Sequence, residues 1–299
     1  TSAEASRLRA LAFLQEQNGD GAKEQFQQAV AAGGNTRAYA DYARFLIMEG
    51  DIDGARDMSN RALKAAPAGL DALLVGGQMA AMQGDPGLAL KRYSAAADRY
   101  PASVAARIGQ AAVLGDLGRL DDMDRKLTAL AQSGVKTPEL TYLQVKSAAV
   151  RKDWAKVRNL VQAVEWDLPL YDPSRLLYGE ALLRLDQHAQ AIAQIEPVAR
   201  AQPGNRVAQK LLAEAQLAEG DAGGAFTTLR PIADSAGAEP EELQLMAKIA
   251  AATGDASADS YRVRAVDLAE ANSTMRKGNW AGAVTAYDRM LASTDGKNA

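Results

Sequence analysis

The feature that most restricts the fold of this chain is a Gly-Asp step that returns every 34 residues. The positions at this spacing are Gly50-Asp51, Gly84-Asp85, Gly118, Lys152, Asp186, Gly220-Asp221 and Gly254-Asp255. Six consecutive intervals of 34 residues are hard to produce by chance in an ordinary globular domain. An internal period of this size indicates stacked structural units, each in contact mainly with its neighbours. The period therefore constrains the architecture before any catalytic motif is considered.

Composition excludes several classes of protein. Apolar residues make up 47% of the 299 residues, enough to form a core, whereas aromatic residues are only 5%. The formal net charge of −3 gives no basic excess, so nucleic acid is not expected as a partner. The sequence has no run of 18 apolar residues for a membrane span and no cysteine for disulfides or thiolate metal sites. The chain begins Thr1-Ser2-Ala3 without Met, which leaves open N-terminal processing or excision from a longer protein.

Each repeat is predicted to contain a helix, a tight turn and a second helix. Numbering each unit from fourteen residues before its Gly-Asp step gives the units 3–35, 36–69, 70–103, 104–137, 138–171, 172–205, 206–239, 240–263 and 264–299. Position 8 is small at Ala10, Ala43, Gly77, Ala111, Gly179, Ala213, Ala247 and Ala271, with Val145 as the exception. Position 20 is often alanine, at Ala22, Ala55, Ala89, Ala191, Ala225 and Ala283. Small residues at these two positions let two antiparallel helices approach closely.

Glycine and proline mark where the helices are expected to end and begin. Glycine at position 15 reaches the left-handed conformation of a helix end without a Cβ penalty. The Asp that follows it can accept hydrogen bonds from the first amides of the next helix. Proline is expected to follow second helices at Pro67, Pro101, Pro169 and Pro203, and to begin first helices at Pro138 and Pro173. Pro197 and Pro231, both at position 26, are expected to bend a second helix or break its hydrogen bonds.

The final interval breaks the period. Gly254 and Gly278 are 24 residues apart instead of 34, and residues 256–277 contain neither proline nor glycine. We therefore expect the second helix of one unit to run directly into the first helix of the next, as a fused helix about 33 Å long. The polar run Asn272-Ser273-Thr274 is the place where such a helix would instead be interrupted.

This pattern resembles the tetratricopeptide repeat (TPR) family. Small residues at positions 8 and 20, an apolar or aromatic residue at 24, alanine at 27 and proline at 32 are its signature. Residues 70–101 carry the signature most fully, with Gly77, Gly84, Ala89, Tyr93, Ala96 and Pro101. The resemblance covers nearly the whole chain. It implies an all-α fold, a right-handed TPR superhelical solenoid of about nine helix pairs that runs continuously through residues 1–299.

Patterns of catalytic or metal-binding residues are not found in the sequence. His188 is the only histidine, which removes most Ser-His-Asp schemes and multi-histidine metal sites, and its position just after the turn predicts a packing role. The acidic run 121–124 lacks the glycine and the glutamate of a calcium loop and is interpreted as the polar start of a helix. Trp154 and Trp280 share the turn position of His188 and, like Trp166, are expected to pack in the core. We therefore expect no catalytic residue, no metal and no cofactor.

The resemblance also implies where a partner binds. In stacked TPR units the first helices line a concave face that holds an extended or helical peptide, through positions 2, 5, 9, 12 and 13. The candidate partner-binding residues are Arg37, Arg44, Met48, Asp71, Gln78, Glu139, Tyr142, Lys146, Glu180, Arg184, Lys210, Glu214 and Lys248. Arg37 and Arg44, with Arg7 nearby, are the candidates for contact with an acidic partner segment. Tyr142 with Lys146 is the candidate for a central contact, because aromatic residues often anchor interfaces.

Two classes of function stay open at the level of sequence. The resemblance favours a non-catalytic scaffold that binds a protein or peptide partner. The Ala-rich, Cys-free and mildly acidic composition is similar to that of TPR proteins in bacterial envelope machines for pilus assembly, secretion or exopolysaccharide export. This similarity favours the bacterial periplasm over the cytoplasm. The alternative is the substrate-selecting portion of a larger enzyme, such as a glycosyltransferase or a peptidase.

Overall fold

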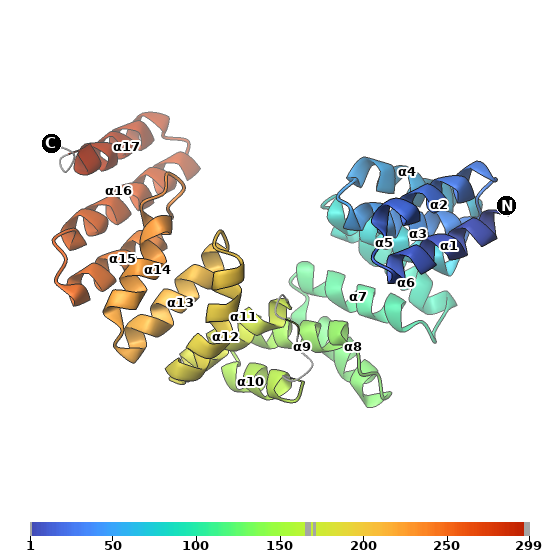
Figure 1. Ribbon diagram of the computed structural model, residues 1–299, viewed down its shortest axis with the longest axis horizontal. Helices are drawn as coiled ribbons and strands as arrows, with labels where there is room; N and C mark the ends of the chain where they lie inside the picture. Colours follow the sequence, from blue (N-terminus) through green and yellow to red (C-terminus); the bar gives the residue numbers. More distant parts are fainter. Residues whose placement is uncertain (1, 165–168, 170–171, 296–299) are drawn as a thin grey trace. The chain divides into compact units, whose positions relative to one another are not determined.

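The computed structural model describes residues 2–164, 169 and 172–295, which form seventeen α-helices and no strand (Figure 1). In chain order the helices are α1 (Ala3–Gln15), α2 (Gly19–Ala31), α3 (Thr36–Met48), α4 (Ile52–Ala65), α5 (Leu70–Met82), α6 (Pro86–Arg99), α7 (Val104–Asp116), α8 (Leu120–Gln132), α9 (Pro138–Val150), α10 (Trp154–Gln162), α11 (Pro173–Arg184), α12 (His188–Ala201), α13 (Arg206–Glu219), α14 (Ala222–Ala233), α15 (Pro240–Thr253), α16 (Ala258–Arg276) and α17 (Trp280–Asp295). The prediction of an all-α chain built from helix pairs is confirmed.

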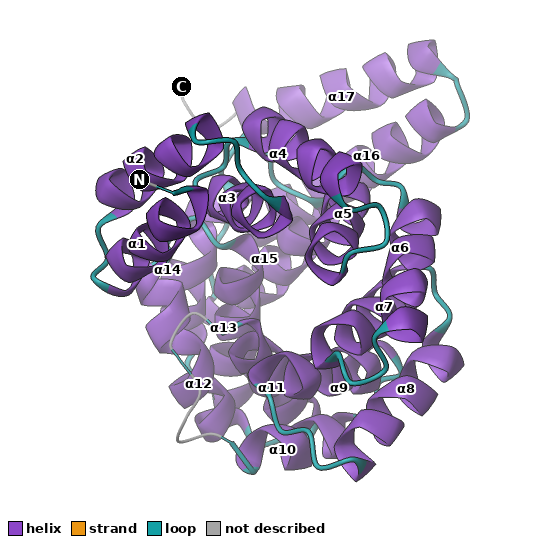
Figure 2. Ribbon diagram, turned by 90° about the vertical axis from the view of Figure 1, so that its right-hand side faces the viewer, coloured by secondary structure: helices purple, strands orange, loops and turns teal. Residues whose placement is uncertain are grey.

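The chain divides into two compact units, Thr1–Ser147 and Ala148–Ala299, with α9 spanning the boundary between them. From α1 to α8, and again from α10 to α17, helices that follow one another in sequence pack side by side (Figures 1 and 2). First helices of neighbouring repeats also touch, as α3 touches α5 and α11 touches α13. Each repeat therefore contributes one first helix to a common face within its unit.

The core of the unit Thr1–Ser147 is built around an aromatic cluster. The ring of Phe26 on α2 lies 5.3 Å from that of Tyr42 and 5.6 Å from that of Phe45, both on α3. All three side chains are buried. The small residues Ala10 and Ala22, predicted at positions 8 and 20, are fully buried in the same cluster. They let α1 and α2 approach closely enough to cover the aromatic rings.

The core of the unit Ala148–Ala299 is mainly aliphatic. Leu229, Leu243, Met246 and Ile249 are completely buried where α14, α15 and α16 meet. The close approach predicted from small residues is tightest at Gly179 on α11, where an added Cβ would collide with the side chain of Ile195 on α12. The repeat thus keeps its small positions in both units while the large residues differ.

The backbone is left-handed at each position of the 34-residue period. Every residue at this spacing has a positive φ, with values of 80° at Gly50, 58° at Lys152, 57° at Asp186 and 95° at Gly220. The residue that follows caps the next helix in several units, as Asp51 Oδ1 accepts from the amide of Gly54 at 2.9 Å. Asp85, Asp153 and Asp221 accept equivalent hydrogen bonds. The predicted left-handed glycines and capping Asp residues are confirmed, and Lys152 and Asp186 adopt the same left-handed backbone without glycine.

The prolines inside helices and the shortened last interval leave the helices continuous. Pro197 lies inside α12 and Pro231 inside α14, and both helices continue past them, so neither proline ends its helix. Helix α16 is a single helix of 19 residues, about 28 Å long, that includes residues 272–274. It packs against both α15 and α17. The predicted fused helix is confirmed, and the polar run does not interrupt it.

The tryptophans depart from the prediction. Trp280 begins α17 with its side chain 67% exposed, so the core position predicted for it is wrong. Within the described residues, α17 packs extensively only against α16, which leaves its remaining faces in solvent. Trp154 begins α10 and is partly exposed. Trp166 lies outside the described residues. His188 begins α12 and is partly exposed, at the turn position expected for it.

Candidate partner-binding surfaces

All thirteen candidate partner-binding residues lie on first helices, and none of them is buried. Those on α3 and α5 are Arg37, Arg44, Met48, Asp71 and Gln78. Those on α9, α11, α13 and α15 are Glu139, Tyr142, Lys146, Glu180, Arg184, Lys210, Glu214 and Lys248. Position within the repeat therefore selected accessible side chains, and their neighbours differ greatly between the two units.

In the unit Thr1–Ser147 the candidate arginines belong to an ion-pair network. Arg7 Nη1 on α1 lies 2.6 Å from Asp41 Oδ2 on α3, and Asp41 Oδ1 lies 2.7 Å from Arg44 Nη1. Asp71 on α5 lies 3.7 Å from both Arg44 and Arg37. The structure thus brings Arg37, Arg44 and Asp71 together and adds Asp41, which the sequence pattern missed. Much of the positive charge on this face is balanced within the chain.

The network is anchored at the first helix by Glu4. Hydrogen bonds from Arg7, and secondly from Asn35, lower the pKa of Glu4 from 4.5 to about 2. The hydrogen bond with Glu4 is also the main reason why the pKa of Arg7 is raised. Both groups are therefore charged throughout the neutral range, and Arg7 is held between Glu4 and Asp41.

Exposed methionines lie beside this network. Met48 at the end of α3 is 74% exposed, and Met82 at the end of α5 is 46% exposed. Both occupy position 13 of their repeats, and so does Val150 at the end of α9, which is 59% exposed. The sequence pattern had singled out Met48 alone. The signal that would have found Met82 and Val150 is the same 34-residue spacing applied to that position.

The candidate central contact lies on α9. Lys146 Nζ is 3.1 Å from Asp116 Oδ1 on α7, so it joins neighbouring first helices. Tyr142 is partly buried and packs against a cluster that includes Leu114 and Leu130. Glu139 is exposed in the first turn of α9.

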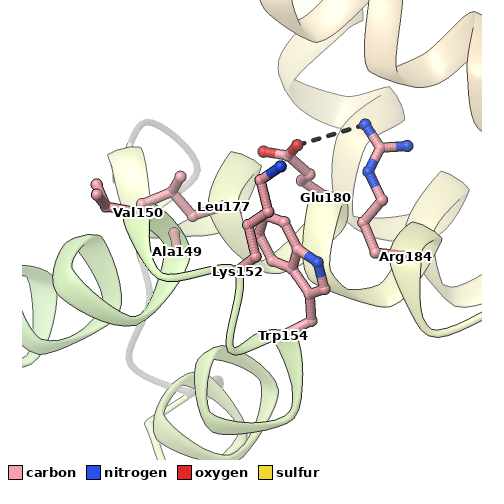
Figure 3. A pocket seen from close by; sticks show the side chains of 7 residues that line it. All are labelled: Ala149, Val150, Lys152, Trp154, Leu177, Glu180 and Arg184. Atoms are coloured by element: carbon pink, nitrogen blue, oxygen red, sulfur yellow. Dashed lines mark hydrogen bonds and ion pairs between the residues drawn. The ribbon is translucent and has the colours of Figure 1, made fainter.

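In the unit Ala148–Ala299, Arg184 is the hub of the first-helix face. Its guanidinium lies 3.4 Å from Glu180 on the same helix and 3.0 Å from Glu214 on α13. Pockets open on both sides of this arginine. The first has a volume of about 530 Å³ and is shown in Figure 3, lined by Ala149, Val150, Lys152, Trp154, Leu177, Glu180 and Arg184.

The second pocket has a volume of about 400 Å³ and extends over α13 and α15. Its lining comprises Arg184, Glu214, Leu217, Ala218, Glu241, Gln244, Leu245 and Lys248. The two pockets share Arg184 and so adjoin at this side chain; together they are called the groove. The structure thus brings together Glu180, Arg184, Glu214 and Lys248 from the sequence prediction, whereas Lys210 lines neither pocket.

A further pocket of about 470 Å³ is lined by residues of α6, α7 and α8. Its charged lining includes Arg119 and Arg125, both of which pair with Asp122. Asp122 lies in the first turn of α8, which confirms that the acidic run 121–124 starts a helix.

Chemical groups suited to catalysis or metal binding are sparse. No cluster of three or more His, Cys, Asp or Glu side chains in the described ranges is arranged to hold a metal ion. The nitrogens of His188 lie 3.6 Å from Asp186 and 3.9 Å from Glu219. Among the helices that the structure describes, none is both long and apolar enough to cross a membrane.

Comparison with known proteins finds one family model that matches parts of the chain. The tetratricopeptide repeat model matches residues 7–70 and 176–240, one segment in each unit. No significant match is found among curated protein sequences.

Three solved structures share the fold. A tetratricopeptide repeat protein from Parabacteroides merdae is 13% identical with a TM-score of 0.56, and the match covers 83% of this chain and 98% of that one. The human IFIT1 dimer with PPP-AAAA is 12% identical with a TM-score of 0.62, covering 95% and 81%. Yeast Tom70 is 19% identical with a TM-score of 0.54, covering 84% of this chain but only 55% of its own. The family model thus identifies tetratricopeptide repeats in both units, and the solved structures show that the chain has the fold of a tetratricopeptide repeat protein.

Proposed function

We propose that this chain is a non-catalytic scaffold that binds a partner polypeptide along its first-helix faces. The observation that carries the proposal is the groove on α11, α13 and α15, where two pockets meet at Arg184. The linings combine apolar side chains with a few charged ones, which is the composition of sites that recognise specific ligands. Two adjoining pockets that extend over three first helices suit a chain-like ligand better than a compact one.

The candidate residues divide between two roles under this proposal. Glu180, Arg184, Glu214 and Lys248 contact the partner directly within the groove, since they line its pockets. In the other unit, Arg37 is 69% exposed and is the arginine best placed to meet an acidic partner segment. Exposed Met48 and Met82 supply adaptable apolar contacts there, because methionine is flexible and polarisable.

A role in a bacterial envelope assembly is the narrower form of the proposal. It is supported by the composition alone, which is rich in alanine, lacks cysteine and carries a formal charge of −3.

Site-specific photocrosslinking tests which face binds. A photoreactive amino acid at Gln244, an exposed groove residue on α15, is compared with one at Gln190, an exposed residue on the second helix α12. With a phage-displayed library of random peptides as the probe, we expect crosslinked peptides from Gln244 and few from Gln190. Equal crosslinking at both positions, or preference for Gln190, would overturn the assignment of the binding face.

A further inference from the structure

The pocket around Trp154 has a composition found nowhere else along the 34-residue period. Trp154 occupies the turn position held by Ile52, Leu120 and His188 in other repeats, and Lys152 occupies the position held mainly by glycine. Both side chains line the same pocket, between the end of α9 and helix α11 (Figure 3). Trp280 holds the same turn position in the last repeat but follows Gly278, so this is the turn where tryptophan and lysine occur together.

Lys152 is costly for the fold at this position. Its φ of 58° is left-handed, a conformation that costs a side-chain-bearing residue about 1–2 kcal/mol. Glycine meets the same requirement at Gly50, Gly84, Gly118, Gly220 and Gly254, and the other exceptions are Gln17 and Asp186. Strain at one residue of a pocket points to a role for its side chain.

The charges around the pocket leave Lys152 available. Arg184 is held by Glu180 and Glu214, at 3.4 and 3.0 Å. The Lys152 side chain is exposed, and no hydrogen bond or ion pair joins its ammonium to any residue in the described ranges. Among the described residues, Lys152 is therefore the lining cation without an ion pair, and Glu180, the carboxylate of the same lining, is paired with Arg184.

The walls of the pocket are apolar and include an aromatic ring. Val150 and Leu177 stand with Ala149 on one side, and the indole of Trp154 forms another part of the lining. Its volume of about 530 Å³ is ample for one large side chain. An aromatic pair gains about 0.5–1.5 kcal/mol beyond area burial, so Trp154 favours an aromatic guest over an aliphatic one.

We propose that the Trp154 pocket anchors the partner by an aromatic side chain, with an adjacent Asp or Glu of the partner paired to Lys152. The partner is thus a polypeptide segment in which an aromatic residue is flanked by acidic ones. This inference rests on the proposed function and specifies the ligand of its groove. Glu180 and Glu214 support it indirectly, because they hold Arg184 in place between the two pockets.

The experiment selects a phage-displayed random peptide library on the wild-type chain and on a Lys152→Glu variant. Peptides from the wild type should carry an aromatic residue next to Asp or Glu. The charge reversal should shift the flanking residues to Lys or Arg, and it should weaken wild-type peptides by about two- to fivefold. Lys156→Glu, at an exposed residue of α10, is the matched control and should leave the selection unchanged.

Trp154→Ala supplies the second measurement. It should weaken the selected peptides by about tenfold or more, as expected for an aromatic anchor. Circular dichroism checks that the variant is folded. If Trp154→Ala unfolds, the proposal is still tested by Lys152→Glu, which changes an exposed side chain.

The outcomes separate the two proposals. Groove-crosslinked peptides without the aromatic-acidic pattern, or an unchanged pattern for Lys152→Glu, would overturn the Trp154 anchor and leave groove binding standing. Peptides that crosslink only from Gln190 would overturn groove binding, and the anchor with it.

Discussion

The two units carry different surfaces and different cores on the same repeat. In Thr1–Ser147 the first-helix face is crossed by the network of Arg7, Asp41, Arg44 and Asp71, and the core is aromatic. In Ala148–Ala299 the first-helix face opens into two pockets around Arg184, and the core is mainly aliphatic. The backbone constraints are shared, since small positions and left-handed turns recur in both. The repeat therefore constrains the small positions and the turns, whereas its surface residues and its large core residues can differ from one unit to the other.

The largest expected effect is the loss of stability when a large core residue is truncated in one unit or the other. Phe26→Ala should cost about 3–5 kcal/mol of unfolding free energy, because it removes the centre of the aromatic cluster. All three tryptophans lie in Ala148–Ala299, so tryptophan fluorescence reports that unit while circular dichroism reports both. We expect the dichroism transition to fall further than the fluorescence transition. Leu229→Ala, in the other core, should reverse the order, and identical shifts of both signals in both variants would show that the units unfold as one.

The second prediction concerns the closest helix approach. Gly179→Ala should destabilise the unit Ala148–Ala299 by about 1–3 kcal/mol, because the added Cβ collides with Ile195. Gly204→Ala is the control, since nothing lies within 4 Å of a Cβ there. Chemical denaturation followed by tryptophan fluorescence measures both variants. A tolerated Gly179→Ala would mean that α11 and α12 separate easily.

A smaller effect compares the turns. Asp186→Gly should stabilise the chain by up to about 1 kcal/mol, because it relieves a side-chain-bearing residue of a left-handed φ of 57°. Gly84→Ala, at the matching turn of the other unit, should destabilise by about 1–2 kcal/mol for the same reason. Thermal unfolding by calorimetry shows whether each variant is stabilised or destabilised. A destabilised Asp186→Gly would show that the interactions of the Asp186 side chain stabilise the fold by more than its left-handed backbone costs.

The smallest prediction concerns pH and the network of the first unit. The pKa of Glu4 is lowered to about 2 in the folded chain, so its hydrogen bonds stabilise the fold above the ordinary pKa of 4.5. This contribution is lost as pH falls from 4.5 toward 2. The difference in unfolding free energy between wild type and Glu4→Gln should therefore shrink across that range. A difference that stays constant from pH 6 to pH 2 is the contrary result.

Much of the fold could be predicted because it depends on local chemistry. The left-handed turns at Gly50, Gly84 and Gly220 followed from the spacing of the glycines, and the continuous α16 followed from the lack of breakers in residues 256–277. The candidate surface was found only in part. The pairing of Arg44 with Asp71 depends on how α3 and α5 lie side by side, and the pocket at Trp154 depends on Leu177, which is distant in sequence. Such details depend on tertiary packing at one place in the chain, whereas a repeat pattern describes only what the units share.

The shared helix α16 makes the last three helices indivisible. In a regular array a terminal pair can be deleted, or can open by itself, without harming the pair before it. Here the predicted unit boundary at 263/264 falls in the middle of a continuous helix that α15 and α17 both cover. Cutting the chain there would strip Ala265, Leu268 and Ala271 from the helix that remains. Shortened versions of this protein should therefore lose α15, α16 and α17 as one cooperative block.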